Sequence, residues 1–152
     1  MKKWIWLAAV AVIAAGIWIY HMPKEIHHEL KGIIYSVDGA FEQPAEIIVT
    51  GKKYPDPFGK PVMMGTVSID GLFQVPVTMV FDGTSYFCAV TESGDDKVQI
   101  TKGTVYASRE LDRFWIQLLD VNEHYGLQEA YIFAPAKDRK EANTSIEEML
   151  KD

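Results

Sequence analysis

Apolar and polar residues alternate along residues 62–90, VMMGTVSIDGLFQVPVTMVFDGTSYFCAV, more regularly than anywhere else in the chain. Two dipeptides typical of tight turns, Asp70-Gly71 and Asp82-Gly83, interrupt this alternation. Strict alternation places every second side chain on the same face of a β-strand. The pattern therefore predicts three consecutive antiparallel strands joined by short turns.

The apolar face also predicts how the first two of these strands pair. A three-residue loop, Ile69-Asp70-Gly71, places Val67 opposite Phe73 and Met63 opposite Val77 on one apolar face. A two-residue loop would instead set the apolar face of one strand against polar residues of the other. We therefore predict the three-residue loop.

Further strands are expected on both sides of this region, from their β-branched and aromatic residues. They are residues 32–37, 45–50, 97–107 and 128–135. Residues 111–126 fit two templates, a helix ending at Gly126 and a strand around Trp115. After Asp138, with Glu141 three residues later, an apolar stripe predicts a C-terminal helix.

The predicted fold class is α+β. We expect a mainly antiparallel β meander of six to eight strands, arranged as a sandwich or a partly open barrel, with a C-terminal α-helix. The chain of 152 residues leaves room for one such domain.

Residues 4–20, WIWLAAVAVIAAGIWIY, contain no charge and no amide side chain. As a helix this segment would be about 26 Å long, enough for a hydrocarbon core. Its aromatic residues cluster at both ends, and Lys2 and Lys3 place the short N-terminal end in the cytoplasm. We predict a transmembrane signal anchor (residues 1–22), a juxtamembrane linker (23–31) and an extracytoplasmic domain (32–152) at the cell membrane. A signal peptide cleaved after the small residues Ala14 and Gly16 is the alternative.

The charges disfavour a nucleic-acid partner, and the spacing of the histidines argues against a metal site. After Met22 the chain carries 13 basic and 21 acidic residues, a formal charge of −8, which disfavours nucleic acid. His27, His28 and Glu29 raise the question of a metal site, but adjacent histidines point to opposite sides of a strand or a helix. Residues 21–31 are better explained as a polar link or as the start of the first strand. We predict no metal site and no cofactor.

Two aromatic residues are the candidate binding residues. The segment GKKYPDPFGKP, residues 51–61, holds three prolines and two glycines and predicts a surface loop. Tyr54 and Phe58 lie in it, where exposed aromatic side chains can anchor a protein partner of the envelope. The single cysteine, Cys88, excludes an intrachain disulfide and fits a small buried apolar residue.

The C-terminal part of the chain resembles a group of small, uncharacterised proteins of Gram-positive, spore-forming bacteria that carry one membrane segment or export signal. The resemblance rests on AYIFAPAKDRKEANTSIEEML, GTVSIDG, GTVYAS and LDRFWIQL, and it covers residues 60–152. It implies a strand for residues 113–119. It implies no activity, so no functional residue is transferred.

No catalytic constellation is present in the sequence. Nucleophile motifs, phosphate-binding glycine loops and metal-ligand spacings are all missing. We therefore predict a membrane-tethered binding or interaction module without catalytic residues. The alternative is a β-barrel that binds a small apolar ligand, and an enzyme whose site is scattered along the sequence is a second alternative.

Overall fold

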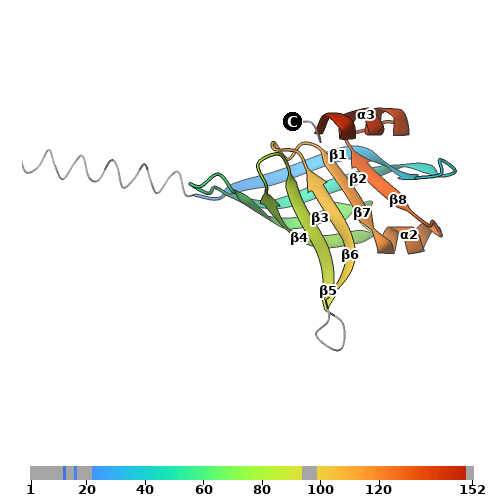
Figure 1. Ribbon diagram of the computed structural model, residues 1–152, viewed down its shortest axis with the longest axis horizontal. Coiled ribbons are helices and arrows are strands. Elements are labelled where there is room, and N and C mark those ends of the chain that lie inside the picture. The colour runs from blue at the N-terminus through green and yellow to red at the C-terminus, as the bar shows by residue number, and fades with distance from the viewer. Residues whose placement is uncertain (1–11, 13–15, 17–21, 94–98, 150–152) are drawn as a thin grey trace, which may run out of the picture.

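The computed structural model describes Val12, Gly16 and residues 22–93 and 99–149, and its main body is a closed antiparallel β-barrel (Figure 1). Each strand pairs with the next along the chain, and β8 pairs with β1 to close the ring. The strands are β1 (Lys24–Ser36), β2 (Glu42–Tyr54), β3 (Val62–Ile69), β4 (Phe73–Phe81), β5 (Tyr86–Ser93), β6 (Gln99–Ala107), β7 (Phe114–Leu118) and β8 (Ala130–Ala134).

The mainly antiparallel meander is confirmed, and the strands form one closed ring rather than a sandwich or a partly open barrel. Ring closure follows from the pairing of Ile33 with Phe133 and of Tyr35 with Tyr131, which joins the first strand to the last. The sequence could not distinguish these architectures, because a sandwich and a barrel share the same alternation along each strand.

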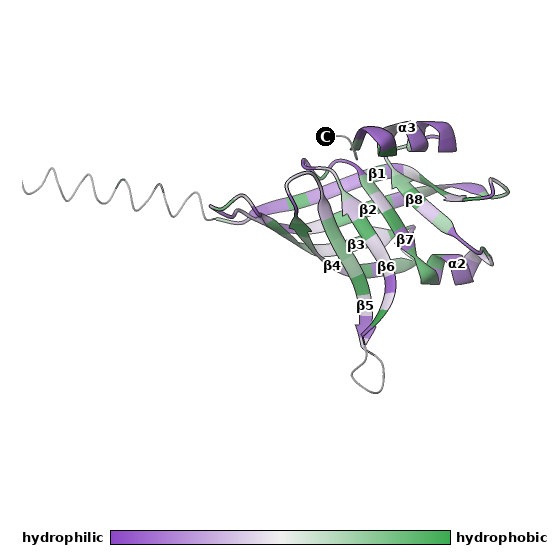
Figure 2. Cartoon of the chain, in the orientation of Figure 1, coloured by the Kyte–Doolittle hydropathy of each residue, from purple (hydrophilic) through white to green (hydrophobic). Residues whose placement is uncertain are grey.

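The inward face of the barrel is the hydrophobic core. In β4, for example, Val75, Val77, Met79 and Phe81 are buried, and the residues between them are exposed. Figure 2 shows this alternation as green and pale bands along the strands. Burying one such large apolar side chain stabilises the fold by roughly 1.5–3 kcal/mol.

The turn between β3 and β4 differs from the prediction by two residues in register. Ile69 pairs with Phe73 and Val67 with Val75, so the apolar face is as predicted but the partners are shifted. The predicted pairing of Val67 with Phe73 is wrong because Asp70 and Gly71 both adopt left-handed backbone angles, with φ of 50° and 67°. Leu72 N donates to Ile69 O at 3.0 Å and closes the turn at that point.

The polar segment before residue 32 is strand. Residues 24–31 form the first half of β1 and pair with residues 46–53 of β2, so they are not a free linker. His27 and His28 consequently lie on opposite faces of β1, as alternation requires. His27 Nε2 lies 3.2 Å from Glu29 Oε1 in an exposed pair.

The ambiguous segment after Arg113 contains both predicted elements in succession. Residues 114–118 form β7, which confirms the strand, and Leu119–Tyr125 then form the short helix α2. α2 ends at Gly126, whose φ of 65° is the left-handed conformation of a helix C-cap. The strand pattern and the helix pattern both fit the sequence because each describes one half of the segment.

The C-terminal helix α3 (Arg139–Met149) covers the outer wall of the barrel, beside β1 and β8 (Figure 1). Its predicted start is confirmed, because Asp138 Oδ1 accepts from Glu141 N at 2.8 Å and Glu141 Oε2 accepts from Lys137 N at 2.9 Å. A second, smaller core forms under α3, outside the barrel. Its buried residues are Ile33, Tyr35, Phe133, Ala136 and Ala142.

Within the part of the chain that the structure describes, no helix combines the length and the apolar character that crossing a bilayer requires. The predicted membrane segment, residues 4–20, lies outside the described residues apart from Val12 and Gly16. The anchor therefore stays a prediction.

Candidate functional site

A pocket of about 320 Å³ opens at the end of the barrel where β1 begins. The ends of several strands and the loop between β2 and β3 surround it. It is lined by Lys24, Lys53, Pro55, Asp56, Gly59, Pro61, Phe81, Tyr86 and Arg109. The lining residues come from positions that are far apart in the sequence, between Lys24 and Arg109, so the fold of the barrel brings them together.

Two aromatic rings from the turn between β4 and β5 form the apolar part of the pocket. The ring centroids of Phe81 and Tyr86 lie 5.1 Å apart, at an interplanar angle of 52°. Both side chains point inward and belong to the barrel core. They give the pocket a rigid floor, because each is held by core packing on its other side.

The hydroxyl of Tyr86 is a buried polar group without a hydrogen-bond partner among the described residues. Burial, reinforced by the Glu110 carboxylate and opposed by Arg109, raises the pKa of Tyr86 to about 12. The hydroxyl is therefore neutral at physiological pH and able to donate. An unpartnered buried hydroxyl costs roughly 1–3 kcal/mol, which a suitable acceptor would recover.

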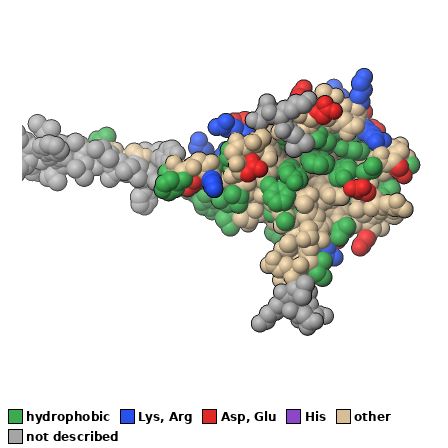
Figure 3. All heavy atoms as spheres, viewed as in Figure 1, with side chains coloured by type: hydrophobic (Ala, Val, Ile, Leu, Met, Phe, Trp, Pro, Cys, Tyr) green, Lys and Arg blue, Asp and Glu red, His purple; other side chains and the backbone are tan. Residues whose placement is uncertain are grey.

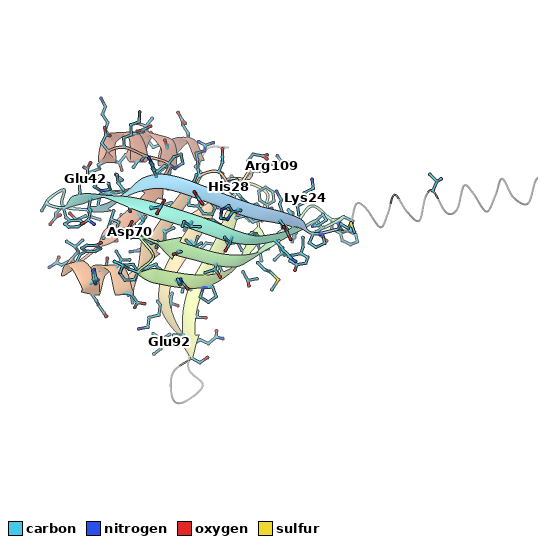
Figure 4. The ribbon with its side chains drawn as sticks, turned by 180° about the vertical axis from the view of Figure 1, so that it is seen from behind. Lys24, His28, Glu42, Asp70, Glu92 and Arg109 are labelled. Carbon is cyan, nitrogen blue, oxygen red and sulfur yellow. The ribbon has the colours of Figure 1, made fainter. Side chains whose placement is uncertain are left out.

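Three cationic side chains surround these rings. Lys53 Nζ lies 5.4 Å from the centroid of the Tyr86 ring, and Arg109 Cζ lies 5.8 Å from the centroid of the Phe81 ring. Figure 4 shows Lys24 and Arg109 at the same end of the barrel, opposite Glu42 and Asp70. Three of the four charged residues that line the pocket are basic and the fourth is Asp56, so the pocket carries a net positive charge.

Arg109 is held by a compact turn after β6. The Ser108 side-chain oxygen accepts from Asp112 N at 3.2 Å and from Arg113 N at 3.1 Å, and its hydroxyl donates to Asp112 Oδ1 at 2.6 Å. Leu111, with φ of 61°, is buried in the barrel core. Lys53 Nζ also donates to Arg109 O at 3.5 Å, which connects the end of β2 to this turn.

The loop between β2 and β3 forms the remaining wall, and Asp56 organises it. Asp56 Oδ2 accepts from Phe58 N at 3.1 Å and from Lys60 N at 2.9 Å, the pattern of an aspartate-stabilised turn. The predicted binding residues Tyr54 and Phe58 lie at this end of the barrel and are 40% and 89% exposed, but Tyr54 is the last residue of β2 and not part of a loop as predicted. Neither lines the pocket, so the structure brings them near the site but not into it.

His124 and Cys88 do not line this pocket. His124, on α2, makes edge-on ring contacts with Phe73 and Tyr125 at 5.5 and 4.8 Å. Cys88 is buried on the inward face of β5, and its thiol donates to Ala89 O at 3.5 Å.

The pocket was not apparent from the sequence. Lys24, Lys53, Phe81, Tyr86 and Arg109 belong to five separate segments, and none forms a motif. One signal was available in retrospect: Lys53 and Arg109 both stand at strand ends, and in an up-and-down barrel the ends of alternate connections meet at one rim.

Comparison with known proteins finds no matching family model, no matching curated protein and no matching solved structure. The function of this protein is therefore inferred from the geometry of the barrel and its pocket.

Proposed function

We propose that this protein is a binding protein whose barrel holds a small ligand at the rim where β1 begins. The ligand would have an apolar body, packed on Phe81 and Tyr86, and an acidic group facing Lys24, Lys53 and Arg109. The observation that carries the proposal is the buried Tyr86 hydroxyl, which lacks a partner among the described residues and belongs to a residue that lines the pocket together with these cations. A barrel whose end forms a ligand site is a common use of this architecture.

We also propose that residues 4–20 anchor the domain to the cell membrane, with the barrel outside. β1 begins at Lys24, four residues after the predicted anchor, a distance of at most about 14 Å. The binding rim would then face the membrane surface. Tyr54 and Phe58, exposed at the same rim, would contact the membrane surface or an envelope protein partner.

The membrane part is tested by expressing the full chain with a C-terminal tag. The expected result is full-length protein in the membrane fraction, with the tag cleaved when protease is added outside sealed cells. A shortened protein in the medium, or a tag protected from external protease, would show that the anchor is wrong without affecting the ligand proposal.

The ligand proposal is tested with short amphiphiles on the full chain in nanodiscs of zwitterionic phospholipid. Octyl phosphate is the acidic probe, octyl trimethylammonium is its cationic counterpart, and inorganic phosphate lacks the apolar body. Binding is measured by saturation-transfer NMR on the alkyl protons and by phosphorus NMR. We expect octyl phosphate to bind and both other probes to bind at least tenfold more weakly.

Neighbouring lysines of β2 supply the matched variants. Lys53→Met and Tyr86→Phe each remove one group that faces the acidic head, so each should weaken octyl phosphate binding roughly tenfold or more. Lys52→Met changes a neighbouring lysine that is exposed and does not line the pocket, and it should leave the affinity unchanged. Equal binding of the cationic probe, or equal effects of the two lysine changes, would contradict the proposal.

A further inference from the structure

The wall of the barrel is weakest between β4 and β5. These strands share two residue pairs, Val80 with Phe87 and Phe81 with Tyr86, whereas β3 and β4 pair along eight residues. A register shift between Val90 and Thr91 interrupts the pairing of β5 with β6 and bends β5. Figure 1 shows the β5–β6 hairpin projecting beyond the rest of the barrel toward its tip.

β4 and β5 diverge beyond these two pairs and leave a gap in the barrel wall. Backbone groups of both strands face this gap. Phe81 N donates to Pro61 O on the β3 side, and Asp82 N donates to Ser85 O across the turn to β5. Because these directions alternate along a strand, Val80 and Thr78 present their backbone groups toward β5, and Phe87 and Ala89 present theirs toward β4. Beyond the pair of Val80 with Phe87, no further strand pairing crosses the gap among the described residues.

The edges of β4 and β5 that face the gap differ in the backbone donors that they offer. Pro76, on β4, has no backbone N–H, so this edge offers fewer donors to a new strand. The edge of β5 carries no proline, and Ala89 has both a backbone N–H and a carbonyl oxygen. An incoming strand would therefore pair mainly with β5.

The groove along the gap has the side chains that such a strand needs. Its volume is about 660 Å³; Pro76, Thr78 and Val80 form one wall, and Phe87, Ala89 and Thr91 form the other. Val80 and Phe87 are 46% and 38% exposed, which is high for large apolar residues in an outer wall. Figure 3 shows hydrophobic side chains gathered on this face of the molecule.

Aromatic rings extend this apolar surface from the groove toward α3. The ring centroids of Phe87 and Tyr106 lie 4.8 Å apart, and those of Tyr106 and Trp115 lie 5.4 Å apart in a stacked arrangement. Trp115 in turn contacts Tyr131 at 5.4 Å. Phe87 and Tyr106 of this row line the groove, so alternate side chains of a bound strand could pack against their rings.

The charge at the closed end of the groove is negative. Asp82 is the charged residue among the described lining residues, and hydrogen bonds from the backbone N–H groups of Ser85 and Thr84 lower the pKa of its carboxyl. Asp82 is therefore ionised at neutral pH. A basic side chain at one end of the bound segment would complement it.

We propose that this groove binds an extended peptide segment of a partner protein, which adds a strand to β5. The segment has apolar side chains at alternate positions and a lysine or arginine at the end beside Asp82. Strand addition to an exposed sheet edge supplies affinity through the main chain and specificity through alternate side chains. This site is separate from the rim pocket and does not depend on the ligand proposed there.

The test uses the full chain in zwitterionic nanodiscs and a six-residue peptide of alternating valine and threonine with a lysine at one end. We expect the peptide to slow hydrogen exchange at the Ala89 amide, as measured by NMR. Methylating alternate peptide nitrogens should weaken binding at least tenfold, because it removes the main-chain donors. Replacing the lysine by glutamate should weaken it several-fold.

Two changes on β5 provide matched controls. Ala89→Pro removes the proposed donor at an unpaired edge, where proline is tolerated, and should abolish binding, whereas Ala89→Ser keeps the donor and should not change it. Phe87→Thr is a second variant that leaves the backbone intact, removes the aromatic wall and should weaken binding.

Four results would overturn the proposal. The first is equal binding of the methylated peptide, and the second is no protection of Ala89 at millimolar peptide. The third is protection of Ala89 that depends on protein concentration without peptide, which would assign the groove to a second copy of the chain. The fourth is binding of an oligosaccharide to the aromatic row that Ala89→Pro does not affect, which would show that the site binds a glycan and not a peptide.

Discussion

At the scale of single residues, Tyr86 and Trp115 each bury a polar side-chain atom that has no hydrogen-bond partner among the described residues, and Tyr86 is the one that lines the rim pocket. It is fully buried in the barrel, yet its hydroxyl has no hydrogen-bond partner among the described residues. Buried polar groups are usually paired, and an exception calls for a reason. A role of the hydroxyl in ligand binding at the rim would be such a reason. In that case the hydroxyl of Tyr86 contributes to binding and not to stability.

Replacing Tyr86 by phenylalanine should therefore not destabilise the protein. The change removes a buried hydroxyl that costs roughly 1–3 kcal/mol and keeps the ring that packs on Phe81. We expect an unchanged or higher free energy of unfolding in urea titrations. Tyr86→Ala, which also removes the ring, should lower it by about 3–5 kcal/mol. A clear loss of stability in Tyr86→Phe would mean that the hydroxyl is paired.

The raised pKa of Tyr86 also predicts a dependence of stability on alkaline pH. A tyrosine whose pKa is about 12 in the folded state and about 10 in the unfolded state favours folding below pH 10. This contribution is lost as pH rises from 10 to 12, because the unfolded chain releases its proton first. The free energy of unfolding should fall over this range, and fall less in Tyr86→Phe.

Tyr131 is the matched control for this pH effect, since its pKa is also raised to about 12, mainly by the hydrogen bond to Glu129. Tyr131→Phe should remove a separate part of the loss between pH 10 and 12. If both variants show the full wild-type loss, other groups cause it.

At the scale of elements, the barrel depends on glycines at points where strands approach closely. Gly51 on β2 pairs directly with Gly65 on β3. A Cβ atom at Gly65 would overlap the carbonyl oxygen of Thr50, and one at Gly51 would overlap that of Met64. These are backbone atoms of the neighbouring strand, so no side-chain rotation can relieve the overlap. Glycine within a strand commonly marks such close backbone approach.

Replacing Gly65 by alanine should consequently lower the free energy of unfolding by about 1–3 kcal/mol, the usual cost of overpacking. Thr50→Ala, at an exposed position on the facing strand, should change it by about 0.5 kcal/mol or less. Urea titration of both variants measures the difference. Equal stability of the two would show that the strands separate there at no cost.

At the scale of the whole molecule, α3 and the barrel form two cores that share one wall. Ile33 and Phe133 point outward from the barrel and are buried because α3 covers them. Arg139 supports this packing, since its Nη2 donates to Val37 O at 2.7 Å and its Cζ lies 5.9 Å from the Tyr35 ring centroid. Figure 2 shows α3 as mostly hydrophilic on its visible side, as expected for a helix that lies on a protein surface.

Ending the chain after Ala136 should therefore uncover an apolar patch without opening the barrel. Each large apolar side chain exposed should cost roughly 1.5–3 kcal/mol, and the truncated protein should bind a hydrophobic dye and self-associate. Circular dichroism should still report a β-sheet spectrum. Lys140→Ala, an exposed change on α3, is the control. A monomeric truncated protein with unchanged stability would refute this role of α3.

The sequence by itself determined the strands, most of their inward faces and the start of α3. These features are local: alternation along β4 and the Asp138 and Glu141 pair depend on residues a few positions apart. The strand formed by residues 24–31 was not predicted with certainty, because these residues are mostly polar and their strand partner, β2, lies further along the chain. The observed register between β3 and β4 differs by two residues from the predicted one. Alternation determines which face of a strand is apolar, but it does not determine which residue of the neighbouring strand lies opposite.

Only the tertiary structure decided that the sheet closes, and closure created both proposed sites. The pairing of β8 with β1 joins residues about a hundred positions apart, and no local pattern encodes that contact. The same closure brings Lys53, Tyr86 and Arg109 to one rim and leaves β4 and β5 paired at just two positions. Distances between strands depend on twist, bulges and packing summed around the whole ring, so neither the rim pocket nor the open groove could be foreseen from the order of residues.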